Sequence, residues 1–235
     1  YTLTGNWDPM DIGTIMSTMS LVNSPLVLEY KNWRYEPPVV EMRKSGLLRS
    51  GQHIVKSGEL VFESDAVDFT LRDLIERTPE KRLPDAVAMS IIAQVWHAIN
   101  YLRTVSPYIR IFCLDPSTIA LTHVPGTTPA LYNVRLTRYI PLLFFPALTN
   151  ETRLFCSPLL LQHVARQSAY TNAIFAGPKA DLHAFAIFVT YLWTGKLPYP
   201  PQYATTMLAS SSKPYALPAF GRPDVEAFVR NVLLN

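Results

Sequence analysis

Cysteine and histidine are among the residues of this chain whose side chains could act as nucleophiles, bases or metal ligands. Cys113 could serve as a nucleophile with a histidine partner, because a base that takes the thiol proton creates the attacking thiolate. We favour the alternative that Cys113 is a buried, unreactive thiol, as structural cysteines usually are. The histidines lack the spacing of metal ligands, so we expect no metal site. They are His53, His97, His123, His163 and His183.

The two cysteines, Cys113 and Cys156, are too few for a disulfide framework. We therefore expect an intracellular, reducing location, either the cytoplasm or an organelle or cytoskeletal assembly. The longest apolar stretches, residues 139–148 and 184–193, are shorter than the ~20 residues that a membrane span needs, so we expect no span. The chain begins at Tyr1 without a signal pattern, and a start other than Met indicates a fragment or a processed product.

The composition favours a protein that covers part of its surface with a partner. Hydrophobic residues make up 49% of the chain and charged residues 17%, against about 25% charged in typical soluble domains. The net charge is only +3 and the basic residues form no long runs, so nucleic acid is not indicated as a partner. Residues 43–56 contain four cations and no acids, which is typical of a solvated loop or of a contact with an acidic partner.

Apolar residues at three- and four-residue spacing predict helices over residues 11–22, from 69, from Pro84, over 181–193 and from Pro223. The clearest helical stripe follows Pro84 and consists of Val87, Ile91, Val95, Ile99 and Leu102. Strands are predicted at residues 26–35, 59–63, 108–112, 118–121 and 131–136, and residues 36–57 as a loop or an edge hairpin. The order of elements indicates an α+β chain with a small β-containing part at residues 1–66 and a mainly helical part at residues 67–235.

Eight segments resemble, in the same order, characteristic segments of the protein-kinase family. They are residues 59–63, 69–75, 99–102, 114–121, 134–137, 157–159, 180–186 and 194–199. Residues 114–121 (LDPSTIAL) are similar to the catalytic-loop tail L-K-P-x-N-I-L-L, and residues 194–199 (TGKLPY) match the T-G-x-x-P-F turn. The spacing departs near residues 123–132 and 162–179. The resemblance implies a protein-kinase-like fold with a truncated β-containing N-lobe and a helical C-lobe.

The positions that would carry phosphoryl transfer in this family are changed. Cys113 stands where the H-R-D loop has its Asp, and a thiol with a pKa of about 8.5 is a poor substitute for a carboxylate. Thr118 replaces the magnesium-binding Asn, and Arg138 replaces the Asp of D-F-G. A cation at that position would repel Mg²⁺ at a cost of several kcal/mol, on the order of 4 kcal/mol per unit charge pair. Leu159 replaces the Glu of A-P-E, and Ile15 falls where the αC helix has its Glu.

The folding residues of the resemblance are retained, above all Asp181. The resemblance implies that its carboxylate accepts backbone N–H groups of the catalytic loop and braces the helical lobe. From the sequence we also expect Asp181 to cap the start of its helix. A Gly-rich loop and a lysine-bearing strand are missing, and they could lie upstream of Tyr1.

These expectations describe a pseudokinase: not an enzyme, without cofactor, unable to bind ATP productively, and acting as a scaffold for other subunits of a stable complex. One alternative is an atypical nucleotide binder or weak kinase. The other is an unrelated helical enzyme with a chance resemblance.

Overall fold

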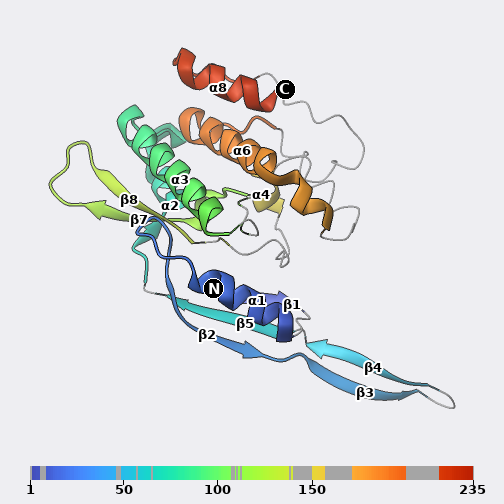
Figure 1. Cartoon of the computed structure of the whole chain (residues 1–235). Helices are drawn as coiled ribbons and strands as arrows, with labels where there is room; N and C mark the ends of the chain where they lie inside the picture. Colours follow the sequence, from blue (N-terminus) through green and yellow to red (C-terminus); the bar gives the residue numbers. More distant parts are fainter. Residues whose placement is uncertain are drawn as a thin grey trace. The chain divides into compact units, whose positions relative to one another are not determined.

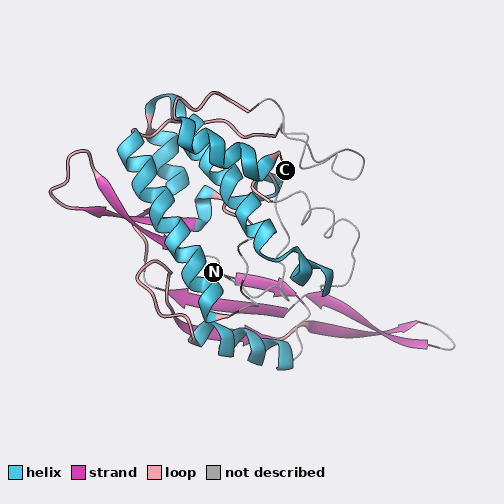
Figure 2. Cartoon of the chain, turned by 45° about the horizontal axis from the view of Figure 1, so that its top comes forward, coloured by secondary structure: helices cyan, strands magenta, loops and turns pink. Residues whose placement is uncertain are grey.

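The computed structural model describes residues 2–5, 9–45, 49–56, 58–64, 66–106, 109, 111, 113–137, 139, 150–156, 171–199 and 217–234. The chain forms two compact units (Figure 1). The smaller unit consists of Tyr1–Leu21 and Glu29–Ala66, and the larger of Val22–Leu28 and Val67–Asn235. Helices make up most of the larger unit, and each unit also contains a small sheet (Figure 2). The described chain is therefore a mixed α and β protein.

The smaller unit contains an antiparallel sheet of order β1-β5-β2, with β1 at Thr2–Gly5, β5 at Gly58–Ser64 and β2 at Tyr30–Glu36. Alternate residues of β5, Leu60 and Phe62, are buried, as expected for one face of a strand. The Phe62 ring packs 5.2 Å from the Tyr30 ring. Strands β3 (Val39–Ser45) and β4 (Arg49–Lys56) pair as a separate hairpin, which is the hairpin alternative of the sequence prediction.

Helix α1 (Pro9–Ser20) of the smaller unit begins at a proline, whose missing N–H costs nothing at a helix start. Its buried residues Ile12, Ile15 and Met19 recur at three and four positions, so one face of the helix is apolar. The prediction of a helix at residues 11–22 is therefore confirmed, with bounds shifted toward the N-terminus.

The larger unit contains an antiparallel sheet of order β6-β7-β8, with β6 at Phe69–Thr70, β7 at Ile119–Val124 and β8 at Leu131–Leu136. The segment Val22–Leu28 lies along β8: the Leu28 N–H donates to the Leu136 carbonyl at 2.9 Å, and the Leu136 N–H donates to the Leu26 carbonyl at 2.9 Å. Residues 26–28 therefore bond to β8 in the larger unit and are not part of strand β2. The predicted single strand at 26–35 was therefore wrong: β2 begins at Tyr30, and the backbone of residues 26–28 bonds to Leu136 instead.

Helix α3 (Asp85–Val105) contacts β8 and α6 (Thr171–Thr194), and α6 contacts α8 (Pro223–Leu233), as Figure 1 shows. All five residues of the predicted α3 stripe are buried. On α8 the residues Val225, Val229 and Leu233 are buried, again at helical spacing. These faces form the core of the larger unit, and burying one such side chain contributes about 1.5–3 kcal/mol.

The other described helices of the larger unit are α2 (Leu71–Arg77), α4 (Asn150–Arg153) and the short 3-10 turns η1 (Pro79–Lys81) and η2 (Pro116–Thr118). Helix α6 ends at Thr194, and the φ of +69° and the N–H bond to the Tyr191 carbonyl of the following Gly195 are typical of a helix C-terminus. No described helix combines the length and the apolar character that crossing a membrane requires.

Candidate functional site

The segment that resembles a catalytic-loop tail folds into a turn organised by Asp115. Asp115 precedes Pro116 at the start of η2, and its carboxylate accepts the Ser117 N–H at 2.9 Å. The Thr118 hydroxyl donates to the Asp115 carbonyl at 2.7 Å. An Asp that caps a turn opened by proline is a local arrangement that the sequence itself favours.

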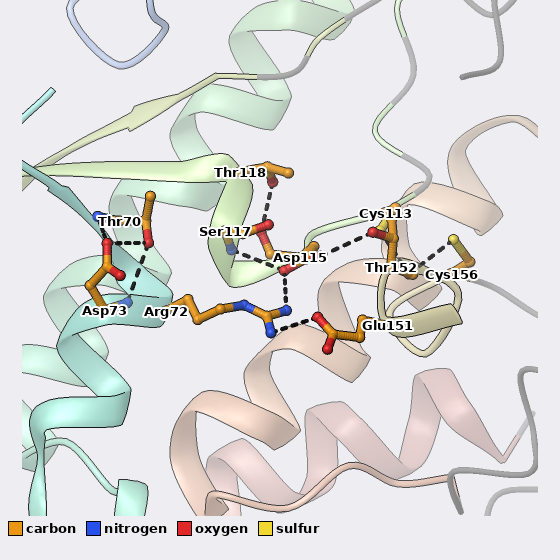
Figure 3. Close-up of polar contacts among 10 residues, drawn as sticks. All are labelled: Thr70, Arg72, Asp73, Cys113, Asp115, Ser117, Thr118, Glu151, Thr152 and Cys156. Carbon is orange, nitrogen blue, oxygen red and sulfur yellow. Dashed lines mark hydrogen bonds and ion pairs between the residues drawn. The ribbon is translucent and has the colours of Figure 1, made fainter. Parts of the chain in front are cut away.

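Helix α2 delivers a cation to this turn. The Arg72 guanidinium donates through Nη2 to Asp115 Oδ1 at 2.9 Å and through Nη1 to Glu151 Oε2 at 2.9 Å (Figure 3). A capping box holds the start of α2, since the Thr70 hydroxyl accepts the Asp73 N–H while the Asp73 carboxylate accepts the Thr70 N–H. The rigid helix start positions Arg72 between two acidic residues that are far apart in the sequence.

The third donor to Asp115 comes from α4. The Thr152 hydroxyl donates to Asp115 Oδ2 at 3.1 Å. Burial by itself would raise the pKa of Asp115, but the Ser117 N–H and the Arg72 guanidinium outweigh burial and hold the pKa below its ordinary value. The Asp115 side chain is only 3% exposed. Asp115 is therefore a buried carboxylate whose oxygens are occupied by donors of the protein itself.

Cys113, at the position of the catalytic Asp in the resemblance, takes part in this cluster. Its thiol donates to the Thr152 carbonyl at 3.1 Å, and the Cys156 thiol approaches the same carbonyl at 3.5 Å. The backbones of the two cysteines form an antiparallel bridge. We call Arg72, Asp115, Thr152 and the two cysteines the Asp115 cluster (Figure 3).

Thr118, at the position of the magnesium-binding Asn, is buried, and its hydroxyl is used within η2. Its carbonyl accepts both the N–H and the hydroxyl of Thr137, each at 2.9 Å. Ile15, at the position of the αC Glu, is fully buried in α1. Arg138 and Leu159 lie outside the described residues, so the structure gives no account of either.

Asp181 is buried inside α6 and accepts the Ile111 N–H at 2.9 Å. Its second oxygen accepts Arg103 Nε at 3.2 Å. A backbone N–H from the segment before Cys113 is the kind of contact that the resemblance implies. The prediction that Asp181 caps its helix was wrong, because α6 begins at Thr171 and continues through Pro178.

Two histidines that sequence patterns placed in helices differ in environment. His97 lies in α3 and is exposed, so it does not pack in the core. His183 is half-buried, with Nε2 2.8 Å from the Tyr199 hydroxyl, and burial lowers its pKa to about 4. His183 is therefore a neutral packing residue at pH 7. Within the described part of the chain, no three His, Cys, Asp or Glu side chains gather as metal ligands would.

Sequence reasoning missed Arg72, Asp115 and Thr152 as members of one cluster. The Asp-Pro-Ser sequence at residues 115–117 was a local signal for the capped turn. Arg72 lies 43 positions from Asp115 and 79 from Glu151, so no local pattern could have joined them. In this geometry the Arg72 guanidinium, the Asp115 carboxylate and the Thr152 hydroxyl hold distant segments together, and the two free thiols are the nucleophilic groups of the cluster.

No family model matches the chain. No curated protein matches it either.

Proposed function

We propose that this chain is a catalytically inactive, protein-kinase-like domain that acts as a scaffold for other protein subunits of a stable complex. The proposal depends above all on one observation about Asp115, the only carboxylate in the described residues 113–118. Its oxygens already accept hydrogen bonds from Arg72, Ser117 and Thr152. A phosphoryl-transfer site needs carboxylates that face the substrate hydroxyl and the Mg²⁺ ions. Here the carboxylate instead forms an internal ion pair.

The neighbouring positions support the same reading. At position 113 a half-buried thiol, already directed to the Thr152 carbonyl, replaces the group that would orient an attacking hydroxyl. At position 118 the hydroxyl is directed to the Asp115 carbonyl. Neither side chain offers Mg²⁺ the anionic oxygen ligands that it prefers. The charge reversal at Arg138, a property of the sequence alone, points in the same direction.

A scaffold role is supported by the surface of the described residues. Trp33 on β2 is 49% exposed and Val39 at the start of β3 is 50% exposed, while Leu21 and Leu234 are 61% and 52% exposed. Tryptophan is one of the residues enriched at the energetic centres of protein interfaces. β2 is also an edge strand of its described sheet, and edge strands pair readily with strands of other chains. Together with the low charged fraction, this favours partner proteins.

A nucleotide-binding measurement tests the catalytic half of the proposal. Melting of the chain is followed with millimolar ATP, with and without Mg²⁺, beside a phosphotransfer assay with labelled ATP. A ligand at 100 times its Kd would add about 2.7 kcal/mol to the free energy of unfolding, so a real site would shift Tm visibly. We expect no shift and no transfer. Robust transfer that disappears in Cys113→Ser or Arg138→Ala would overturn the proposal in favour of an atypical kinase.

A matched pair of variants on β2 tests the scaffold half. The chain is purified from cells that express it natively, and the affinity for its stoichiometric partner is measured with Trp33→Ser and with the neighbouring exposed Asn32→Ser. We expect Trp33→Ser to weaken the complex by about tenfold or more and Asn32→Ser to leave it unchanged. A chain that is monomeric when isolated under native conditions would contradict the scaffold role.

A further inference from the structure

The two thiols of the chain, far apart in the sequence, are neighbours in the larger unit. Cys113 and Cys156 are the only cysteines of the 235 residues, and their backbones are antiparallel bridge partners. Both thiols approach one acceptor, the Thr152 carbonyl, at 3.1 and 3.5 Å (Figure 3). Neither cysteine is engaged in a disulfide.

This backbone geometry matches the requirement for a disulfide. Directly opposed residues of antiparallel strands have Cα atoms about 4.5–5.5 Å apart. Disulfides need Cα separations of roughly 4.4–6.8 Å. A bond between Cys113 and Cys156 therefore requires side-chain rotation and no large movement of the backbone.

The two thiols differ in access to solvent. Cys113 is half-buried, whereas Cys156 is 0% exposed. A hydrogen bond with the Cys113 thiol and burial hold the pKa of Cys156 well above its ordinary value. A small oxidant therefore reaches Cys113 first, and the buried Cys156 thiol reacts second, with the oxidised Cys113.

We propose that Cys113 and Cys156 form a peroxide-sensitive thiol pair that closes into a reversible disulfide. The inference stands on the geometry of the pair and is independent of the kinase-like resemblance. It assigns Cys113 as the residue that peroxide oxidises and Cys156 as the residue that resolves it.

The chemistry balances with hydrogen peroxide as the oxidant. The Cys113 thiolate attacks one peroxide oxygen, the O–O bond breaks, and the released hydroxide takes up the thiol proton to become water. The product is a sulfenic acid on Cys113. The Cys156 thiolate then attacks the Cys113 sulfur, the S–O bond breaks, and the leaving hydroxide takes up the second thiol proton. Two thiols lose two electrons in total, and one peroxide becomes two water molecules.

Closure of the disulfide changes the Asp115 cluster. The S–H donors of Cys113 and Cys156 disappear, so the Thr152 carbonyl loses both of them. The hydroxyl of the same residue donates to Asp115, which couples the redox state of the thiols to the carboxylate. The new covalent bond also links the segment before η2 to the segment that follows α4.

The experiment titrates the folded, reduced full chain with hydrogen peroxide and follows free thiols, intact mass and Tm. We expect the loss of two thiols per peroxide, a monomer lighter by two hydrogens, full reversal by dithiothreitol and a Tm higher by roughly 5–15 °C. Because the chain has only two cysteines, an intramolecular disulfide can only be this one. Closure should be at least tenfold faster in the folded chain than in the chain unfolded in urea.

Two variants separate the roles of the thiols. Cys156→Ser should stop at the sulfenic acid on Cys113, which dimedone traps, and Cys113→Ser should react at least tenfold more slowly. Disulfide-linked dimers in place of the intramolecular bond, a persistent sulfenic or sulfinic acid in the unaltered chain, or equal closure rates in folded and unfolded chains would each overturn the proposal. The folded-against-unfolded comparison needs no variant, so it holds even where a substitution impairs folding.

Discussion

The Arg72 guanidinium lies 2.9 Å from the Asp115 carboxylate, across 43 positions of the sequence, and joins α2 to the turn at η2. The Arg72 side chain is 30% exposed and that of Asp115 is 3% exposed, so the pair is only partly screened by water. Asp115 also caps η2 and receives the Thr152 hydroxyl from α4. One buried carboxylate thus connects three elements of the larger unit.

Removal of the cation from this pair should destabilise the larger unit. Arg72→Met leaves a buried carboxylate without its charged partner, and we expect a loss of about 2–4 kcal/mol in the free energy of unfolding. Asp115→Asn in the same background should recover part of this loss, since the amide carries no charge. Urea denaturation of the two single variants and the double variant measures the coupling energy. Strictly additive losses would show that the two side chains do not interact energetically.

The Asp181 contact should matter more than an exposed ion pair. Asp181→Ala removes the acceptor of the buried Ile111 N–H and one partner of Arg103, so we expect a loss of about 3 kcal/mol. Asp181→Asn keeps an oxygen for the N–H and should lose less. The control is Asp85→Ala, which breaks an exposed pair with Arg82 and should change stability by less than about 0.5 kcal/mol. Equal effects at positions 181 and 85 would contradict the bracing role.

Stability should depend on pH through His183. Burial lowers its pKa to about 4, whereas the unfolded chain titrates near 6.5. Between these values the unfolded state binds a proton that the folded state does not, so stability is complete above about pH 6.5 and falls as the pH decreases to 4. The contribution lost amounts to at most about 3 kcal/mol.

Comparing the unaltered chain with His183→Gln separates the effect of His183 on stability from that of the carboxylates, because the carboxylates titrate in both proteins. The difference in the free energy of unfolding between the two proteins should change with pH between 6.5 and 4 and level off below 4. A difference that stays constant over this range would show that His183 is not buried as a neutral imidazole.

Substitution of two glycines by alanine should change the stability in opposite directions. Gly195 has a φ of +69°, and a Cβ there would lie 3.4 Å from the Glu80 and Lys81 carbonyl oxygens. Gly195→Ala should therefore cost about 1–2 kcal/mol. Gly13 lies in α1 with nothing within 4 Å of an added Cβ, so Gly13→Ala should stabilise by about 0.5–1 kcal/mol. Thermal unfolding measures both, and effects of the same sign would contradict the assigned backbone conformations.

The elements with strong periodicity were predictable because local energetics decide them. The α3 stripe is buried as predicted, strand β8 has the predicted bounds, and α6 ends at Thr194, one residue beyond the predicted end at 193. Prediction failed where a partner from elsewhere in the chain decides the outcome. Residues 26–28 pair with β8 although their composition resembles that of β2, and α6 extends upstream of Asp181 to Thr171.

The sequence alone established the mixed α and β class and the apolar faces, because these depend on residue type and spacing. Whether the resemblance extends to a kinase-like fold stays a prediction. The tertiary structure alone decided that Arg72, Asp115 and Thr152 form one cluster and that Cys113 faces Cys156. Such contacts depend on how distant segments pack, and the residues next to a carboxylate or thiol in the sequence do not indicate its contact partner.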